Sequence, residues 1–154
     1  MRANREFRLV FLVDRDTDLL VIRPIGRATG QQFLEKLFEA YHAVEAVWRY
    51  KRVHDHRRFD GFMTTFDYEE NARRWIALTD GNPLPAFAAI VMLEPDETVR
   101  IARPSHFLPH ETVCRFTDYH EAGHWLNADN KEDYLARLRQ SPETTHRKDS
   151  GEIY

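Results

Sequence analysis

The sequence predicts an α/β fold with a mixed, mostly parallel sheet, an antiparallel strand at its N-terminal edge and packed helices. Apolar residues near the N-terminus recur at every second position, as in a strand. Later segments repeat apolar residues at helical spacing. Phe87–Leu93 is an unbroken apolar run, which favours a central strand covered on both faces.

The first two strands are expected to form a hairpin. In the first, every second position is apolar, at Phe7, Leu9, Phe11 and Val13. Asp14–Asp18 is a polar turn, and Leu19–Ile25 is a second apolar run. Because the link between them is short, the two strands should pair in antiparallel fashion.

A helix should follow over Gly30–Ala43, with Thr29 as its N-cap. Its apolar residues lie at helical spacing: Phe33, Leu34, Leu37, Phe38 and Tyr41. The third strand is predicted at Ala46–Val53, which is rich in Val, Trp and Tyr. The polar and basic segment His54–Phe66 should then form a long loop.

A second helix is predicted to begin at Asp67, which with Glu70 resembles a capping box, and to end at Gly81. Trp75 and Ile76 should pack on the sheet from this helix. Beyond the central strand, three prolines allow at most a short helix between residues 94 and 110.

The C-terminal part should add a short strand and two helices. The strand is predicted at Thr112–Phe116. Thr117 or Asp118 should cap the helix that contains Ala122, Trp125 and Leu126. Asn130 should cap the last helix, Lys131–Gln140.

The length of 154 residues fits one domain, which we predict over residues 1–140, followed by a polar, flexible tail over residues 141–154. A formal net charge of −3 gives no general attraction to nucleic acid or to an anionic membrane, so neither is an expected partner. Cys114 is the single cysteine, which suits a reducing compartment, and we interpret it as a small buried apolar residue. No apolar run is long enough for a membrane span, and no secretory signal is visible, so we expect a cytoplasmic protein.

Two segments carry a family resemblance. Tyr50–Phe62 joins a strand that ends in an aspartate to a Phe-Asp-Gly-Phe turn. Val113–Leu126 joins a strand, a Phe, an acidic N-cap and an Ala-x-x-Trp-Leu helix. Together they resemble the STAS domain of bacterial anti-sigma factor antagonists and, more narrowly, the SpoIIAA-like (STAS/Sec14-like) family. The resemblance covers about residues 7–128, and it implies a STAS-like fold with a binding or regulatory role.

The chain departs from that family at its phosphorylation site. In the antagonists, a phosphorylated Ser or Thr follows an Asp where the helix after the third strand begins. Here no Asp-Ser pair stands at that place, and only Thr64 and Thr65 lie near it. Phosphate there would lie beside acidic residues of the same helix, so we expect no regulatory phosphorylation.

Ligands of open α/β sheets bind at the C-terminal ends of strands, so we expect a ligand site at the end of the third strand. The ligand- or partner-binding site is therefore predicted at Arg52, His54, Asp55, His56, Arg57, Arg58, Thr64 and Thr65. His54 and His56 could chelate a metal because residues two apart on an extended chain point the same way, and a solvated polar turn is the alternative. The arginines could bind a phosphate group, and a salt-bridged surface is the alternative.

A different chemistry is suggested by His120-Glu121-Ala122-Gly123-His124, which is an H-E-x-x-H string. On a helix, the two histidines can hold zinc while the glutamate acts as general base. A cap at Asp118 would place His120 and Glu121 in the first turn, where the helix dipole opposes a cation and Glu121 can complete a capping box.

These patterns lead us to expect a non-enzymatic STAS-like domain that binds a protein partner or a small apolar or anionic ligand. We expect no cofactor, and the chain could form a homodimer. The alternative is a small zinc-dependent hydrolase that uses His120, Glu121 and His124. A third possibility is a metal-free enzyme that uses the His54–Arg58 loop.

Overall fold

The computed structural model describes residues 6–80, 86–93, 102–105, 108 and 110–140. The predicted tail over residues 141–154 and the predicted helix end at Gly81 lie outside the described residues.

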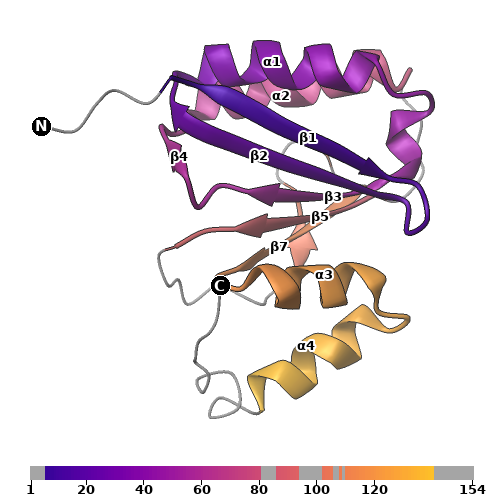
Figure 1. Ribbon diagram of the computed structural model, residues 1–154. Coiled ribbons are helices and arrows are strands. Elements are labelled where there is room, and N and C mark those ends of the chain that lie inside the picture. Colours follow the sequence, from indigo (N-terminus) through magenta and orange to yellow (C-terminus); the bar gives the residue numbers. More distant parts are fainter. Residues whose placement is uncertain (1–5, 81–85, 94–101, 106–107, 109, 141–154) are drawn as a thin grey trace, which may run out of the picture.

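The described strands form one mixed sheet (Figure 1). Its strands, in spatial order, are β1 (Arg8–Asp14), β2 (Leu19–Arg27), β3 (Lys51–Asp55), β5 (Ala86–Val91), β7 (Glu111–Phe116) and β6 (Arg103–Pro104). Strands β2, β3, β5 and β7 are parallel, whereas β1 and β6 are antiparallel to their neighbours. A two-residue strand, β4 (Phe59–Asp60), pairs with the end of β2. The predicted fold class is therefore confirmed, with its antiparallel strand at the N-terminal edge.

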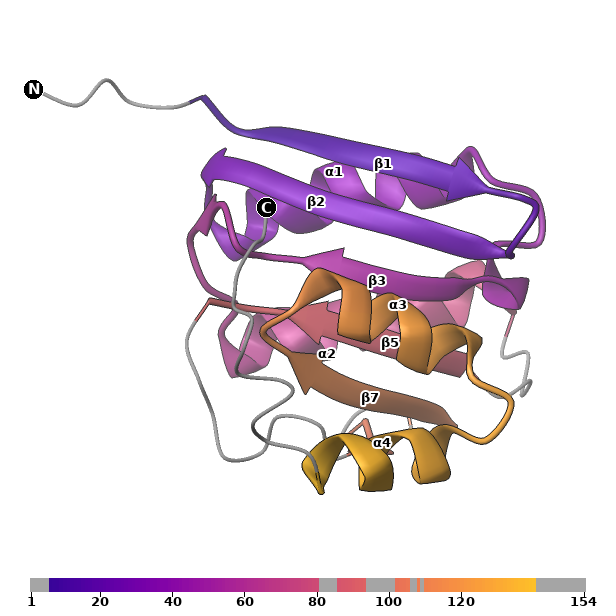
Figure 2. The same ribbon diagram turned by 60° about the horizontal axis from the view of Figure 1, so that its bottom comes forward.

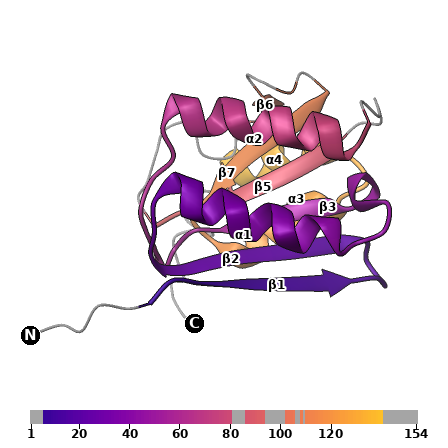
Figure 3. The same cartoon turned by 90° about the horizontal axis from the view of Figure 1, so that it is seen from above.

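Helices cover both faces of the sheet. α1 (Gly30–His42) and α2 (Thr65–Leu78) lie side by side on one face, as the view from above shows (Figure 3). α3 (Tyr119–Asn127) lies on the opposite face, with α4 (Lys131–Arg139) beside it (Figure 2). A short 3₁₀ helix, η1 (Val47–Arg49), precedes β3.

Each face has its own apolar core. The core under α1 and α2 is built around Leu20, Ile22, Leu34, Tyr41 and Trp75. The core under α3 and α4 is built around Val53, Val91, Phe116, Trp125 and Leu126. Because successive side chains of a strand point to opposite faces, neighbouring residues of β2 and β3 contribute to different cores.

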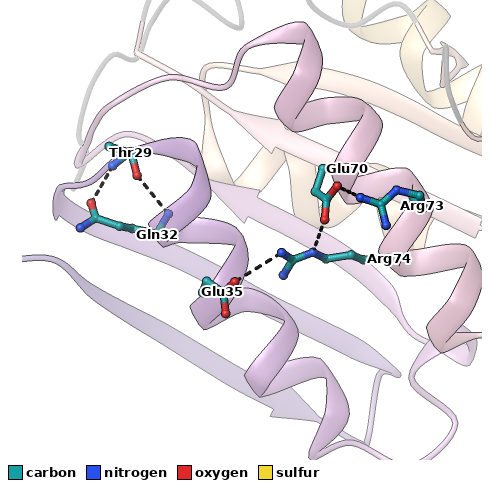
Figure 4. Close-up of polar contacts among 6 residues, drawn as sticks. All are labelled: Thr29, Gln32, Glu35, Glu70, Arg73 and Arg74. Atoms are coloured by element: carbon teal, nitrogen blue, oxygen red, sulfur yellow. Dashed lines mark hydrogen bonds and ion pairs between the residues drawn. The ribbon is translucent and has the colours of Figure 1, made fainter.

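One ion pair and a close contact between Gly30 and the Asp67 side chain join α1 to α2. Arg74 of α2 bridges Glu35 of α1 and Glu70 of its own helix, and Glu70 also pairs with Arg73 (Figure 4). At the start of α1, a Cβ atom on Gly30 would come within 2.2 Å of the Asp67 carboxylate. Only a glycine therefore lets the two helices approach this closely at their N-termini.

Caps begin the helices mostly where the sequence predicts them. Thr29 caps α1, in a reciprocal capping box with Gln32 (Figure 4). Asp118 and Asn130 cap α3 and α4. The predicted start of α2 at Asp67 is wrong, because Thr64 is the cap and Asp67 is the residue that returns a bond to it.

The predicted third strand, Ala46–Val53, is displaced along the chain. Ala46 has a left-handed backbone with φ of 54°, and the 3₁₀ turn η1 follows it, so the extended chain begins only at Lys51. The strand then continues to Asp55, which places His54 and Asp55 inside the sheet instead of in a loop.

The helix α2 packs on the sheet only in part as predicted. Trp75 packs in the core as expected, but Ile76 is 46% exposed, since it lies next to the buried stripe of the helix and not within it.

Two strands after α2 can be compared with the prediction. β5 lies between β3 and β7, which confirms the predicted interior strand, although the strand ends at Val91. Residues 94–110 were expected to hold at most a short helix, yet Arg103–Pro104 forms the edge strand β6.

Candidate functional site

The end of β3 carries the predicted site residues, but the pleat divides them between the two faces of the sheet. Arg52 and His56 contact residues of α1, and His54 lies beside His56. Asp55 points to the other face, where its partners lie close to α3. The predicted residues therefore do not form one site.

On the α3 face, two arginines converge on one carboxylate and one aromatic ring. Arg57 binds Asp55 through two hydrogen bonds, from Nε to Oδ1 at 2.9 Å and from Nη2 to Oδ2 at 2.8 Å. Arg23 of β2 reaches the same carboxylate, with 3.3 Å between Nε and Oδ2. The guanidinium carbons of Arg23 and Arg57 lie 5.0 and 5.7 Å from the ring centre of Tyr119. We call Arg23, Asp55, Arg57 and Tyr119 the arginine cluster.

The acid of this cluster is buried and ionised, and its two arginines are partly exposed. Burial alone would raise the pKa of Asp55, but hydrogen bonds from Arg57 and the charges of Arg57 and Arg23 lower it below its ordinary value. The carboxylate is therefore ionised at neutral pH. Two guanidinium groups thus share one buried carboxylate. The Asp55 side chain is 6% exposed, whereas those of Arg23 and Arg57 are 34% and 23% exposed, so the arginines face the solvent.

On the α1 and α2 face, His54 and His56 lie next to each other with ring centres 6.0 Å apart. Their rings lie on the same side, as expected for residues two apart on an extended chain. The His56 ring also packs at 5.6 Å from the rings of Phe33 and Phe59. Burial lowers the pKa of His56 to about 4, and burial with the nearby Arg52 charge lowers that of His54 well below its ordinary value. Both imidazoles are therefore neutral at pH 7.

Arg52 lies deeper in the same face and its charge is matched inside the protein. Its guanidinium forms an ion pair with Glu111 at the start of β7, and Nη1 donates to the Tyr41 hydroxyl at 3.2 Å. It also lies 4.3 Å from the ring centre of Trp75. Arg52 is 3% exposed and Glu111 is 7% exposed. These contacts give Arg52 a structural role in joining the sheet to α1 and α2.

The remaining predicted residues, Arg58, Thr64 and Thr65, lie in the segment between β3 and the first turn of α2. The Arg58 side chain is exposed, and its backbone oxygen accepts a hydrogen bond from Gly26 N at 3.0 Å. Thr64 Oγ1 accepts from Asp67 N at 3.1 Å and donates to Asp67 Oδ2 at 3.0 Å. Thr65 is exposed in the first turn. Because the Thr64 hydroxyl is engaged in the cap, a phosphate there would have to break the capping box.

The H-E-x-x-H string lies at the start of α3. Asp118 Oδ1 accepts hydrogen bonds from His120 N at 2.7 Å and from Glu121 N at 3.1 Å, so His120 and Glu121 belong to the first turn. His120 and His124 are both exposed, and their rings lie beside Tyr119 and Tyr134. Within the described part of the chain, no three or more His, Cys, Asp and Glu side chains gather where they could hold a metal ion.

Sequence reasoning missed two members of the arginine cluster, Arg23 and Tyr119. Arg23 interrupts the apolar run of β2, and a charged residue within such a run is a signal that it has a partner. Tyr119 follows the Asp118 cap and gave no signal of its own. Both are far in sequence from Asp55, and only the parallel pairing of β2, β3, β5 and β7 brings them to it.

No helix among the described residues is long and apolar enough to cross a membrane. In comparisons with protein-family models, curated proteins and solved structures, none matched this chain at a significant level. The resemblance to STAS domains therefore stays a prediction that rests on Tyr50–Phe62 and Val113–Leu126.

Proposed function

We propose that this chain is a non-enzymatic, cytoplasmic binding domain of the STAS-like kind, and that it takes a small anionic ligand at the arginine cluster. The observation that carries the proposal is the pair of partly exposed guanidinium groups of Arg23 and Arg57, which share one carboxylate. They lie at the C-terminal end of β3, the edge of a parallel sheet where α/β proteins bind ligands.

The chemistry of the cluster favours a phosphate or carboxylate group. A guanidinium presents several N–H donors in a plane, which match two oxygens of such an anion. The contacts of both arginines with Tyr119 and Asp55 restrict their side chains, so less conformational freedom is left to lose on binding. Asp55 competes for the same donors, and binding should therefore be modest in strength.

The geometry of the possible nucleophile and bases supports binding over catalysis. Cys114 is 1% exposed and belongs to the core under α3. His54 and His56 lie on the other face of the sheet, beneath α1, so neither can act as a base for this thiol. The His54–Arg58 segment is therefore better suited to holding a ligand than to reacting with it.

A titration with inorganic phosphate, followed by NMR, tests the proposal. We expect saturable shifts at the Nε–H groups of Arg23 and Arg57, and their loss in Arg57→Gln. Asp55→Asn should bind phosphate more tightly than the natural protein, because the competing carboxylate is gone. Arg137→Gln, an exposed change on α4, is the matched control. Equal responses in all four proteins, or none in any, would contradict an anion site here.

The zinc hydrolase is tested by the metal content of protein purified in metal-free buffers. Two observations speak against a zinc site. His120 and His124 are exposed, and His120 and Glu121 lie in the first turn of α3, where the helix dipole opposes a cation. One equivalent of zinc that disappears in the His120→Ala/His124→Ala variant would establish the metal site and refute a metal-free binding domain.

A further inference from the structure

Strand β1 lies at the outer edge of the sheet (Figures 1 and 3). It pairs with β2 in an unbroken register, from Arg8 opposite Ile25 to Asp14 opposite Leu19. In the described part of the chain, no strand pairs with its other side. The backbone N–H and C=O groups on that side are therefore offered to solvent or to another chain.

The features that usually protect such an edge are missing from β1. Edge strands commonly carry a proline, a bulge or a central charge, each of which discourages pairing with another strand. Here Leu9–Val13 is a run of five apolar residues, the register has no bulge, and charges stand only at Arg8 and Asp14. Leu12 is 50% exposed. The free edge of β1 is therefore suited to pairing with a strand of another chain.

We propose that β1 pairs in antiparallel fashion with β1 of a second copy of this chain, with a register centred on Phe11. In that register the strand is complementary to itself. Arg8 faces Asp14 of the other copy at both ends. Between them, Leu9 faces Val13, Val10 faces Leu12, and the two Phe11 residues face each other. Opposite charges and apolar pairs at facing positions both stabilise a strand pair.

The two end charges select this arrangement over its alternatives. Arg8 is exposed and has no ion pair among the described residues, and Asp14 is held in place because its Oδ1 accepts hydrogen bonds from Asp16 N and Thr17 N. A parallel pair would set Arg8 against Arg8. An antiparallel pair shifted by two residues would set Arg8 against Leu12 or carry it past the end of the other strand.

The resulting dimer would have one continuous sheet through both copies. Its two-fold axis runs perpendicular to the sheet, so α1 and its copy lie on the same face. The arginine cluster lies near α3 on the opposite face and does not contribute to the pairing. Because a single strand pair buries little surface, we expect a dimer whose population depends on protein concentration.

Sedimentation of two charge-reversed variants tests the register. Arg8→Asp sets acidic residues against each other at both ends, and Asp14→Arg does the same with basic residues. Each variant alone should have a dimer dissociation constant at least about tenfold above that of the natural protein. An equimolar mixture of the two variants should restore dimers, because the acidic side chain introduced into one chain then faces the basic side chain introduced into the other. Arg137→Asp, with the same change of charge on α4, should dimerise normally.

Cysteine cross-linking provides a second readout that does not depend on the charges. Facing residues of an antiparallel pair have Cα atoms close enough for a disulfide. Under mild oxidation, a mixture of Val10→Cys and Leu12→Cys chains should form a mixed disulfide dimer faster than either variant alone. The proposal would be overturned by a natural protein that stays monomeric at all concentrations, or by charge variants that dimerise normally. It would also be overturned if the mixture and the two single cysteine variants formed cross-linked dimers at the same rate.

Discussion

Arg52 and Glu111 form a buried ion pair across the sheet, and its two members come from strands on either side of β5. A buried charge that loses its partner is strongly destabilising, because the remaining charge cannot regain its hydration. The contacts of Arg52 with Tyr41 and Trp75 hold it in place and would prevent it from reaching water.

Replacing Glu111 with Gln should therefore lower the free energy of unfolding by about 3–5 kcal/mol. The double variant Arg52→Met/Glu111→Leu should recover much of that loss, because no unpaired charge is left. The control is Glu35→Gln, which removes an exposed partner of Arg74 and should change stability by less than about 1 kcal/mol. Urea unfolding of the four proteins measures these differences. A Glu111→Gln protein as stable as the control would show that the pair contributes little.

His54 of β3 and His56, which follows the strand, link stability to pH. Burial lowers the pKa of His56 to about 4 and that of His54 well below its ordinary value, so the folded protein holds both in the neutral form. In the unfolded chain they bind protons near their ordinary pKa of 6.5. Below that value the unfolded state binds more protons than the folded state, so stability falls as the pH is lowered.

We expect the free energy of unfolding to decrease between pH 6.5 and about pH 4, by up to about 1.4 kcal/mol per pH unit for each histidine. His56→Phe should reduce that slope, since His56 Nε2 is buried without a hydrogen-bond partner among the described residues and a phenyl ring fits between Phe33 and Phe59. Phe62→Leu, at an exposed position that does not titrate, should leave the slope unchanged. Chemical unfolding at several pH values measures it, and a flat natural profile would refute the link.

At the scale of elements, two helical glycines should respond to alanine in opposite directions. A Cβ on Gly30 of α1 would meet the Asp67 carboxylate, and Asp67 is fixed by the α2 cap. A Cβ on Gly123 of α3 would meet nothing within 4 Å.

Gly30→Ala should therefore destabilise the protein by about 1–3 kcal/mol, the usual range for an overpacked site. Gly123→Ala should stabilise it by up to about 1 kcal/mol, since alanine favours a helix more than glycine does. Thermal unfolding of the two variants compares them directly. Equal effects of both substitutions would mean that the contact between α1 and α2 is looser than the structure shows.

The sequence predicted the elements well where one local rule decides them. Thr29, Asp118 and Asn130 are caps because their side chains bind the first free N–H groups, and no distant contact is needed. β3 was misplaced because Val, Trp and Tyr favour strands in general, whereas the left-handed Ala46 makes a turn first. The sequence could not show which of the predicted site residues lie together, since the pleat separates Asp55 from His54 and the partner Arg23 belongs to another strand.

For the whole molecule, the sheet should exchange its amide protons from the outside inward. β5 lies between two parallel neighbours and under helices on both faces, whereas β1 is at an edge. At low protein concentration, amides of Ala86–Val91 should exchange only on global unfolding, and those of β1 through local opening. Native-state hydrogen exchange measures both. Amides of β1 that are as slow as those of β5 in dilute monomer would contradict this ranking.

The order of the strands in space, from β1 to β2, β3, β5 and β7, is also their order in the chain. During synthesis each of these strands can therefore add to the edge that the previous one has just formed. α1 and α2 are made early enough to cover one face as it grows, but α3 and α4 are made after β7. Until then none of the described helices covers the other face, with Val21, Val53 and Ala89. A ribosome-bound chain that ends at β7 should therefore present an apolar sheet to the chaperones that attend nascent proteins.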